Sequence, residues 1–207
     1  GYIKYCQSLG IIAGKSNTIF APNEKVSAQE AAKMLLVTLG YNAQKAGLVG
    51  TGWASKTNAL ADENGLLEDV NTSFTSACPR QYAAQLIYNA VFAYTVVLRD
   101  GEYTNMKLVT GIGNDYNPTI GEKYMGLQKW VGTFEGNEDV CGLDTGLIRV
   151  NGTPDGKDVD KSNADFKYSK LDLSYIGEEV SVLYKDATGG TANKPDKKDT
   201  IYGVYVT

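Results

Sequence analysis

Trp53 and Arg80 are two side chains of this 207-residue chain that could together stack on and grip a sugar. The flat face of an indole packs against the apolar face of a sugar ring, and a guanidinium pairs with an acidic substituent through two parallel hydrogen bonds. The alternative is structural, with Trp53 packed against a hydrophobic core and Arg80 solvated on a helix. Both interpretations stay open on residue type alone.

Other residue types argue against catalysis and metal binding. The chain has no histidine, the commonest general base, and its cysteines (Cys6, Cys78 and Cys141) lack the C-x-x-C spacing of zinc or haem sites. The four aspartates within residues 154–165 lack the spacing of a calcium loop, so a polar turn is favoured there. No local motif singles out a glycosidase pair of carboxylates. We expect no enzyme, no catalytic residue, no metal site and no cofactor.

Charge and hydrophobicity exclude two further classes of protein. The net charge of −4 is opposite to the basic surface that neutralises phosphates, so no nucleic-acid partner is expected. The longest mostly apolar run, residues 90–98, is too short to cross a bilayer, so no membrane span is expected. A hydrophobic content of 43% is typical of a globular protein with a buried core.

An internal repeat organises the first 93 residues. Residues 27–32 (SAQEAA) align with residues 79–84 (PRQYAA) at an offset of 52 positions. In each copy we expect a short helix that ends at a glycine (Gly10 or Gly65), a loop, and a longer helix, because glycine adopts the left-handed closing conformation without strain. The apolar pairs that follow, residues 11–12 and 66–67, should pin each loop to the core.

The longer helix of copy one has clear boundary signals. Ser27 and Glu30 form the pattern of a capping box, Gly40 should end the helix, and Pro79 occupies the matching start in copy two. Helical spacing predicts two core stripes: Ala31, Met34, Leu35, Thr38 and Leu39 in copy one, and Ala83, Leu86, Ile87 and Ala90 in copy two.

After about residue 94 the sequence becomes rich in β-branched and aromatic residues between Gly, Asn and Asp turns. This composition predicts strands within residues 94–99, 106–110, 124–134, 146–150, 180–185 and 200–206. The fold class is therefore α+β, with all-α repeats over 1–93 (copy one 1–47, copy two 48–93) and a connection over 94–121. A small antiparallel β-barrel or sandwich should follow over 122–207.

The repeat resembles the S-layer homology module of bacterial cell-surface proteins. The motifs are GIIAG at residues 10–14, FAPN at 20–23 and VSAQEAAKML at 26–35, followed in copy two by GW at 52–53, NGLL at 64–67 and RQYAAQLIYNA at 80–90. The resemblance implies modules that pack in threes and hold a pyruvylated secondary cell-wall polysaccharide on a Gram-positive envelope. The β-rich part is similar to an oligonucleotide/oligosaccharide-binding (OB) type barrel found in clostridial surface proteins.

The resemblance also implies which residues bind glycan: Trp53, Arg80, Gln81, Ser27, Gln29 and Glu30. The family's longer helix typically begins Thr-Arg-Ala-Glu, with the arginine offered to the polymer's carboxylate. Copy one has Ala28 in that place, whereas copy two keeps Arg80 but has Pro79 and Tyr82 beside it.

We therefore expect a secreted, non-catalytic protein of the cell wall or S-layer that binds secondary cell-wall polysaccharide or a peptidoglycan-linked glycan. Two alternatives stay open. One is a self-assembling S-layer or filament subunit with degenerate modules, and the other is the anchoring region of a larger glycan-degrading enzyme. Because the chain opens inside the first helix of a module, we expect a further module before Gly1.

Overall fold

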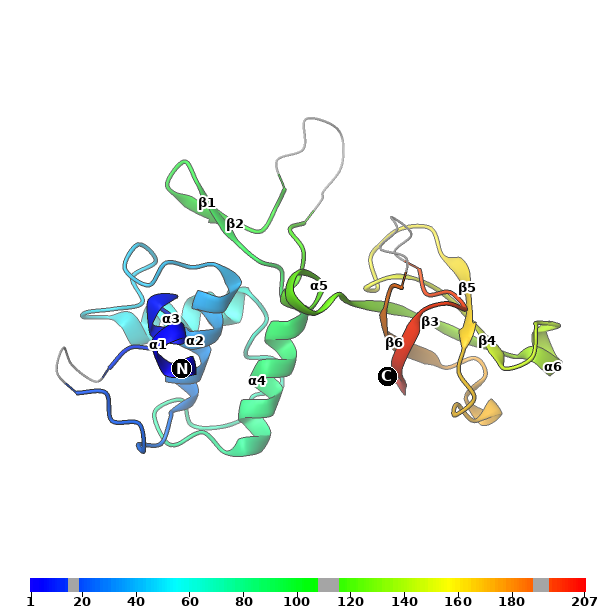
Figure 1. Cartoon of the computed structure of the whole chain (residues 1–207), viewed down its shortest axis with the longest axis horizontal. Coiled ribbons are helices and arrows are strands. Elements are labelled where there is room, and N and C mark those ends of the chain that lie inside the picture. Colours follow the sequence, from blue (N-terminus) through cyan, green and yellow to red (C-terminus); the bar gives the residue numbers. More distant parts are fainter. Residues whose placement is uncertain (15–18, 108–115, 188–193) are drawn as a thin grey trace. The chain divides into compact units, whose positions relative to one another are not determined.

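The computed structural model describes residues 1–14, 19–107, 116–187 and 194–207, and these divide into two compact units, residues 1–120 and 121–207 (Figure 1). The first unit contains helices α1 (Tyr2–Ser8), α2 (Ala28–Leu39), α3 (Trp53–Glu63) and α4 (Arg80–Phe92) and strands β1 (Val97–Arg99) and β2 (Glu102–Thr104). From Ile120 onward follow α5 (Ile120–Met125), β3 (Leu127–Asn137), α6 (Glu138–Cys141), β4 (Leu147–Pro154), β5 (Ser162–Lys167), the 3-10 helix η1 (Leu173–Tyr175), β6 (Glu179–Lys185) and β7 (Thr200–Val206). The chain is thus α+β, as predicted.

The local signals that bound the helices act as predicted. Ser27 caps α2: its Oγ accepts a hydrogen bond from the Glu30 backbone N–H at 3.2 Å, and the Glu30 carboxylate accepts one from the Ser27 N–H at 2.8 Å. Gly40 follows the last residue of α2 with a φ of +122°. Gly10 and Gly65 take φ values of +71° and +69° after α1 and α3, the region that glycine enters without steric cost.

The starts of α2 and α4 are tied together by the backbone. The Cys78 N–H donates to the Val26 carbonyl at 2.8 Å, and Ser27 and Ala77 form an antiparallel bridge. The Gln29 N–H donates to the Phe74 carbonyl at 3.1 Å. Val26 and Cys78 are 52 positions apart, which is the offset of the repeat.

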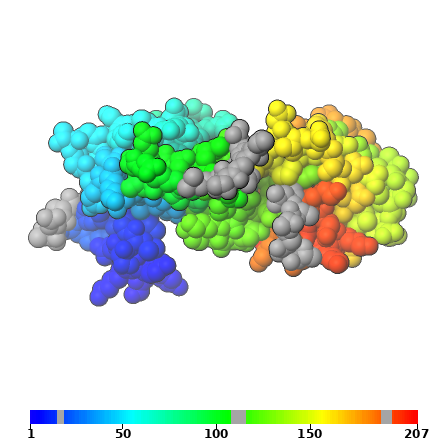
Figure 2. All heavy atoms as spheres, turned by 90° about the horizontal axis from the view of Figure 1, so that it is seen from above, coloured from blue at the N-terminus to red at the C-terminus, as the bar shows by residue number. Residues whose placement is uncertain are grey.

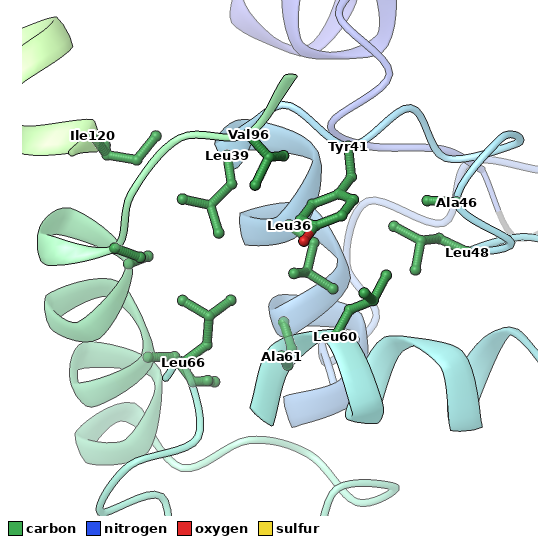
Figure 3. Packing of buried hydrophobic residues seen from close by; sticks show 14 of the residues in the cluster. Leu36, Leu39, Tyr41, Ala46, Leu48, Leu60, Ala61, Leu66, Val96 and Ile120 are labelled. Atoms are coloured by element: carbon green, nitrogen blue, oxygen red, sulfur yellow. The ribbon is translucent and has the colours of Figure 1, made fainter. Parts of the chain in front are cut away.

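Helices α2, α3 and α4 bury their apolar faces in one interior (Figure 3). The stripe on α2 is shifted from the prediction: Ala28, Ala32, Leu36 and Leu39 are the buried apolar residues, while Ala31 and Leu35 are only partly buried. On α4, Leu86 and Ala90 are buried as predicted, but Ile87 is 56% exposed. The prediction for Ile87 was wrong because the buried face of this helix is narrower than its apolar pattern.

Helix α1 differs from the other three, since it contributes no buried residue. Tyr2 and Tyr5 are 91% and 64% exposed, and Ile3 and Leu9 are about half exposed. Figure 2 shows the N-terminal segment, in dark blue, standing out from the rest of its unit. Its counterpart α3 instead buries Leu60 and Ala61.

The described residues of 94–120 fold with the first unit. The Val96 N–H donates to the Leu39 carbonyl at 2.8 Å, and the Val96 side chain joins the core of the helices. The Asn42 N–H donates to the Tyr103 hydroxyl at 2.8 Å, and the Tyr103 ring lies 4.6 Å from that of Tyr41. The β1–β2 hairpin is therefore fastened at the end of α2. Part of the strand predicted over 106–110 lies outside the described residues.

The second unit is one five-stranded antiparallel sheet in the order β5-β4-β3-β6-β7. Among the described residues β5 and β7 are its edges, so the sheet does not close into a barrel. Strand β5 was not predicted and begins inside the expected polar turn. Two of the four aspartates in this stretch form ion pairs. Asp165, on β5, accepts two hydrogen bonds from the Arg149 guanidinium, at 2.7 and 2.8 Å, and Asp155, just after β4, pairs with Lys129 at 3.0 Å.

One face of this sheet carries the core of the second unit. Phe166 on β5 and Val204 on β7 belong to the same buried cluster as Trp130 on β3, so residues from both edge strands enclose one interior. Gly132 and Gly152 lie opposite each other on β3 and β4. A Cβ atom on Gly152 would lie 2.7 Å from the Gly132 Cα atom, so the two strands approach more closely than any side chain allows.

Candidate functional site

An open pocket of about 680 Å³ lies in the first unit, between the loop after α1 and one face of α2. Its walls are mainly apolar and come from α1, the loop, α2 and the start of α3. The lining residues that matter below are Ile3, Ile11, Phe20, Glu30, Lys33 and Trp53. A pocket of this size with few polar groups is typical of a small-ligand site.

The pocket exists because copy one packs less tightly than copy two. Leu66, which follows Gly65, is fully buried in the core, whereas Ile11 and Ile12 in the matching place after Gly10 are only partly buried and line the pocket. The prediction that both apolar pairs pin their loops is confirmed for copy two, where Leu66 is buried and the partly buried Leu67 packs against the core. In copy one the same side chains border open space.

Trp53 is the first residue of α3 and stands at the wall of the pocket. The indole is partly buried, and the Lys33 ammonium lies over it, 5.5 Å from the ring centroid. An ammonium at this distance is attracted by the negative face of the ring. The structural interpretation of Trp53 as a core residue does not fit, because this residue does not belong to the buried cluster.

Burial lowers the pKa of the Lys33 ammonium below its usual value, and the neighbouring Glu30 carboxylate partly offsets this effect. Lys33 makes no ion pair with any part of the chain that the structure describes. Glu30 offsets only part of the cost of burying this charge, and an anionic ligand would relieve more of it.

Three of the six predicted glycan-binding residues gather at the start of α2. Ser27 and Glu30 form the capping box, and Glu30 also lines the pocket. Gln29 is buried, and its backbone N–H is bound to Phe74. Trp53 is the other predicted residue in the pocket. Ser27 and Gln29 thus have structural contacts, Glu30 combines its capping contact with a place in the pocket wall, and Trp53 lines the pocket.

Arg80 and Gln81 occupy the first turn of α4 and are exposed. Neither lines the pocket. Pro79 precedes them as the helix cap and offers no side-chain hydrogen bond. The structure therefore does not bring Arg80 and Trp53 into one site, although the backbone bridges between the two helix starts keep α4 beside α2.

Lys33 is a pocket residue that reasoning from the sequence did not identify. On α2 it follows Glu30 by three positions, so both lie on one side of the helix. The spacing of Glu30 and Lys33 could be read from the sequence. The contact of Lys33 with Trp53, twenty residues further along the chain, could not, because it depends on the fold.

The described ranges contain neither a metal site nor a membrane-spanning helix. Within residues 1–14, 19–107, 116–187 and 194–207, no group of three or more Cys, Asp or Glu side chains is placed to hold a metal ion. The three cysteines are free thiols. No helix in the same ranges has the length and hydrophobicity needed to cross a membrane.

Comparison with known protein families gives one match: the S-layer homology domain, over residues 1–32. This stretch covers α1, the loop and the first residues of α2, and it supplies much of the pocket wall. Comparisons with curated proteins and with solved structures give no match. The match supports a cell-surface protein that is anchored to the cell wall.

Proposed function

We propose that the first unit attaches this protein, without catalysis, to a secondary cell-wall polysaccharide of a Gram-positive envelope, and that the polymer binds in the pocket beside Trp53. The observation that carries the proposal is the coincidence of two features. The stretch that matches the S-layer homology domain forms most of a pocket, and an indole face stands at that pocket's wall. We further propose that the β-rich second unit is OB-like and is the displayed part of a secreted protein.

Sedimentation with purified Gram-positive sacculi tests this function. The protein should pellet with native sacculi and stay in solution with sacculi stripped of polysaccharide by hydrofluoric acid. Trp53→Ala should weaken binding about tenfold to hundredfold, because truncating a tryptophan at the centre of a binding site typically costs about 2 kcal/mol or more. Trp53→Phe should keep part of the affinity.

Arg80→Ala serves as the comparison within the same unit. It removes an exposed cation that lies outside the pocket, so it should leave pelleting close to wild type. A large loss with Arg80→Ala and none with Trp53→Ala would move the binding site from the pocket to the start of α4.

One observation favours a second function, self-assembly. Helix α1 presents Tyr2, Ile3 and Tyr5 to solvent, followed by Leu9, and buries none of them. Exposed apolar residues gathered on one helix are typical of a protein–protein contact. Light scattering across a concentration series distinguishes the two functions, because a self-assembling subunit would grow in mass without sacculi and Tyr5→Ser would suppress that growth.

A further inference from the structure

The charges around the pocket raise the question of which group would meet an acidic ligand. In copy one the second position of the repeat helix is Ala28, which is completely buried and carries no charge. Arg80 lies outside the pocket. Among the described residues, the cations in its wall are Lys25, which is exposed, and Lys33, which is partly buried against Trp53.

We propose that Lys33, held over Trp53, is the residue through which this pocket selects ligands that carry a carboxylate. The inference rests on the proposed function, since it assigns the specificity of the same pocket. A sugar ring stacked on the free part of the indole would place an acidic substituent within reach of an ammonium 5.5 Å from the ring centroid. Lys33 would then take the role that the family's arginine has at the position of Ala28, about one and a half turns earlier on the same helix.

The apolar surroundings make this choice selective. A hydrogen bond between an ammonium and a carboxylate is stronger than a neutral one, and it is stronger still where water is partly excluded. Glu24 and Glu30 also line the pocket and would oppose an anion, but Glu30 is directed toward the Ser27 N–H by the capping box. A neutral sugar would offer the Lys33 ammonium no opposite charge.

Binding to sacculi tests the proposal with three variants. Lys33→Gln should weaken binding to native sacculi about tenfold to hundredfold, the usual effect of losing one charged hydrogen bond. Lys45→Gln is the matched control, since it removes the same charge from an exposed position outside the pocket and should bind like wild type. Sacculi whose carboxyl groups have been reduced to alcohols should bind wild type and Lys33→Gln equally weakly.

The pH dependence of binding distinguishes a charged role of Lys33 from a purely structural one, because a structural role would not change with the charge of the ammonium. Wild-type binding should fall in the alkaline range as the pH passes the lowered pKa of Lys33. Among the described residues that line the pocket, the other titratable groups are Glu24, Lys25 and Glu30. Lys33→Arg, the third variant, keeps its charge at every accessible pH, so it should bind at neutral pH and hold the ligand past the point where wild type releases it.

The possible results separate the two proposals. If wild type binds native sacculi but Lys33→Gln and Lys45→Gln bind equally well, or if carboxyl reduction has no effect, the role of Lys33 is overturned and the anchoring function stands. If wild type fails to bind native sacculi, both are overturned. Thermal unfolding of each variant shows that a loss of binding is not a loss of fold.

Discussion

Replacing Gly152 by alanine should unfold the second unit selectively. The added Cβ atom would run into the Val131 carbonyl group and lie 2.7 Å from the Gly132 Cα atom. Ordinary carbon contacts begin near about 3.5 Å, so the two strands would have to separate by roughly 1 Å at their closest approach. Neither contacting group belongs to a flexible side chain, so the backbone itself must move.

The cost follows from two contributions. Overpacking of a tight interior costs about 1–3 kcal/mol, and each ladder hydrogen bond lost between β3 and β4 costs about 1 kcal/mol. With two such bonds lost the sum is about 3–5 kcal/mol, which lowers Tm by roughly 15–30 °C in a unit of this size. Trp130, buried on β3, reports the transition by its fluorescence when Trp53 is replaced by phenylalanine.

Gly146→Ala is the control for this prediction. Gly146 has a φ of +79°, and no atom lies within 4 Å of the place that a Cβ would take, so alanine there meets only backbone strain of about 1 kcal/mol. Binding to sacculi should survive Gly152→Ala, because the pocket belongs to the other unit. If Gly152→Ala is no less stable than Gly146→Ala, the close approach of β3 and β4 does not constrain the fold as argued.

Two smaller changes are also predicted. Ser27→Ala should lower the free energy of unfolding of the first unit by about 1 kcal/mol, measured in urea, because the Glu30 N–H loses its capping acceptor. The Tyr184 hydroxyl donates to Gln128 at 2.8 Å, and burial raises its pKa far above the usual value of 10.0, with nearby carboxylates adding to the effect. The unfolded chain therefore releases this proton first, so stability should fall as the pH rises above about 10. Tyr184→Phe should remove that part of the alkaline loss in urea titrations at pH values of about 9 and 11, and an unchanged pH slope would contradict the assignment.

Local signals made part of the fold predictable. Ser27, Glu30 and Gly40 act through hydrogen bonds and φ angles within a few residues, so their roles could be predicted without tertiary structure. The buried face of α2 could not, because Ala31 and Ala32 are equally small and apolar and only packing decides between them. Strand β5 could not be recognised in the sequence, because only two of its residues, Ala164 and Phe166, are apolar and buried.

The sequence predicted two residues of the candidate site, Trp53 and Glu30. The chemistry of Trp53 marks it from the sequence, and the structure places it at the pocket wall. The separation of Arg80 from Trp53 and the approach of Lys33 depend on how the helices pack, which no short motif encodes. The pocket itself depends on α1 standing away from the core, whereas the matching helix α3 packs into it.

The attachment of the β1–β2 hairpin to the end of α2 has a practical consequence for dissecting the protein. A fragment cut after α4 would lose Val96 and Tyr103, exposing Leu39 and Tyr41 to water and inviting aggregation. A fragment that extends through Ile120 keeps these partners. Binding studies on an isolated anchor should therefore use the longer fragment, since a failure of the shorter one would report misfolding instead of specificity.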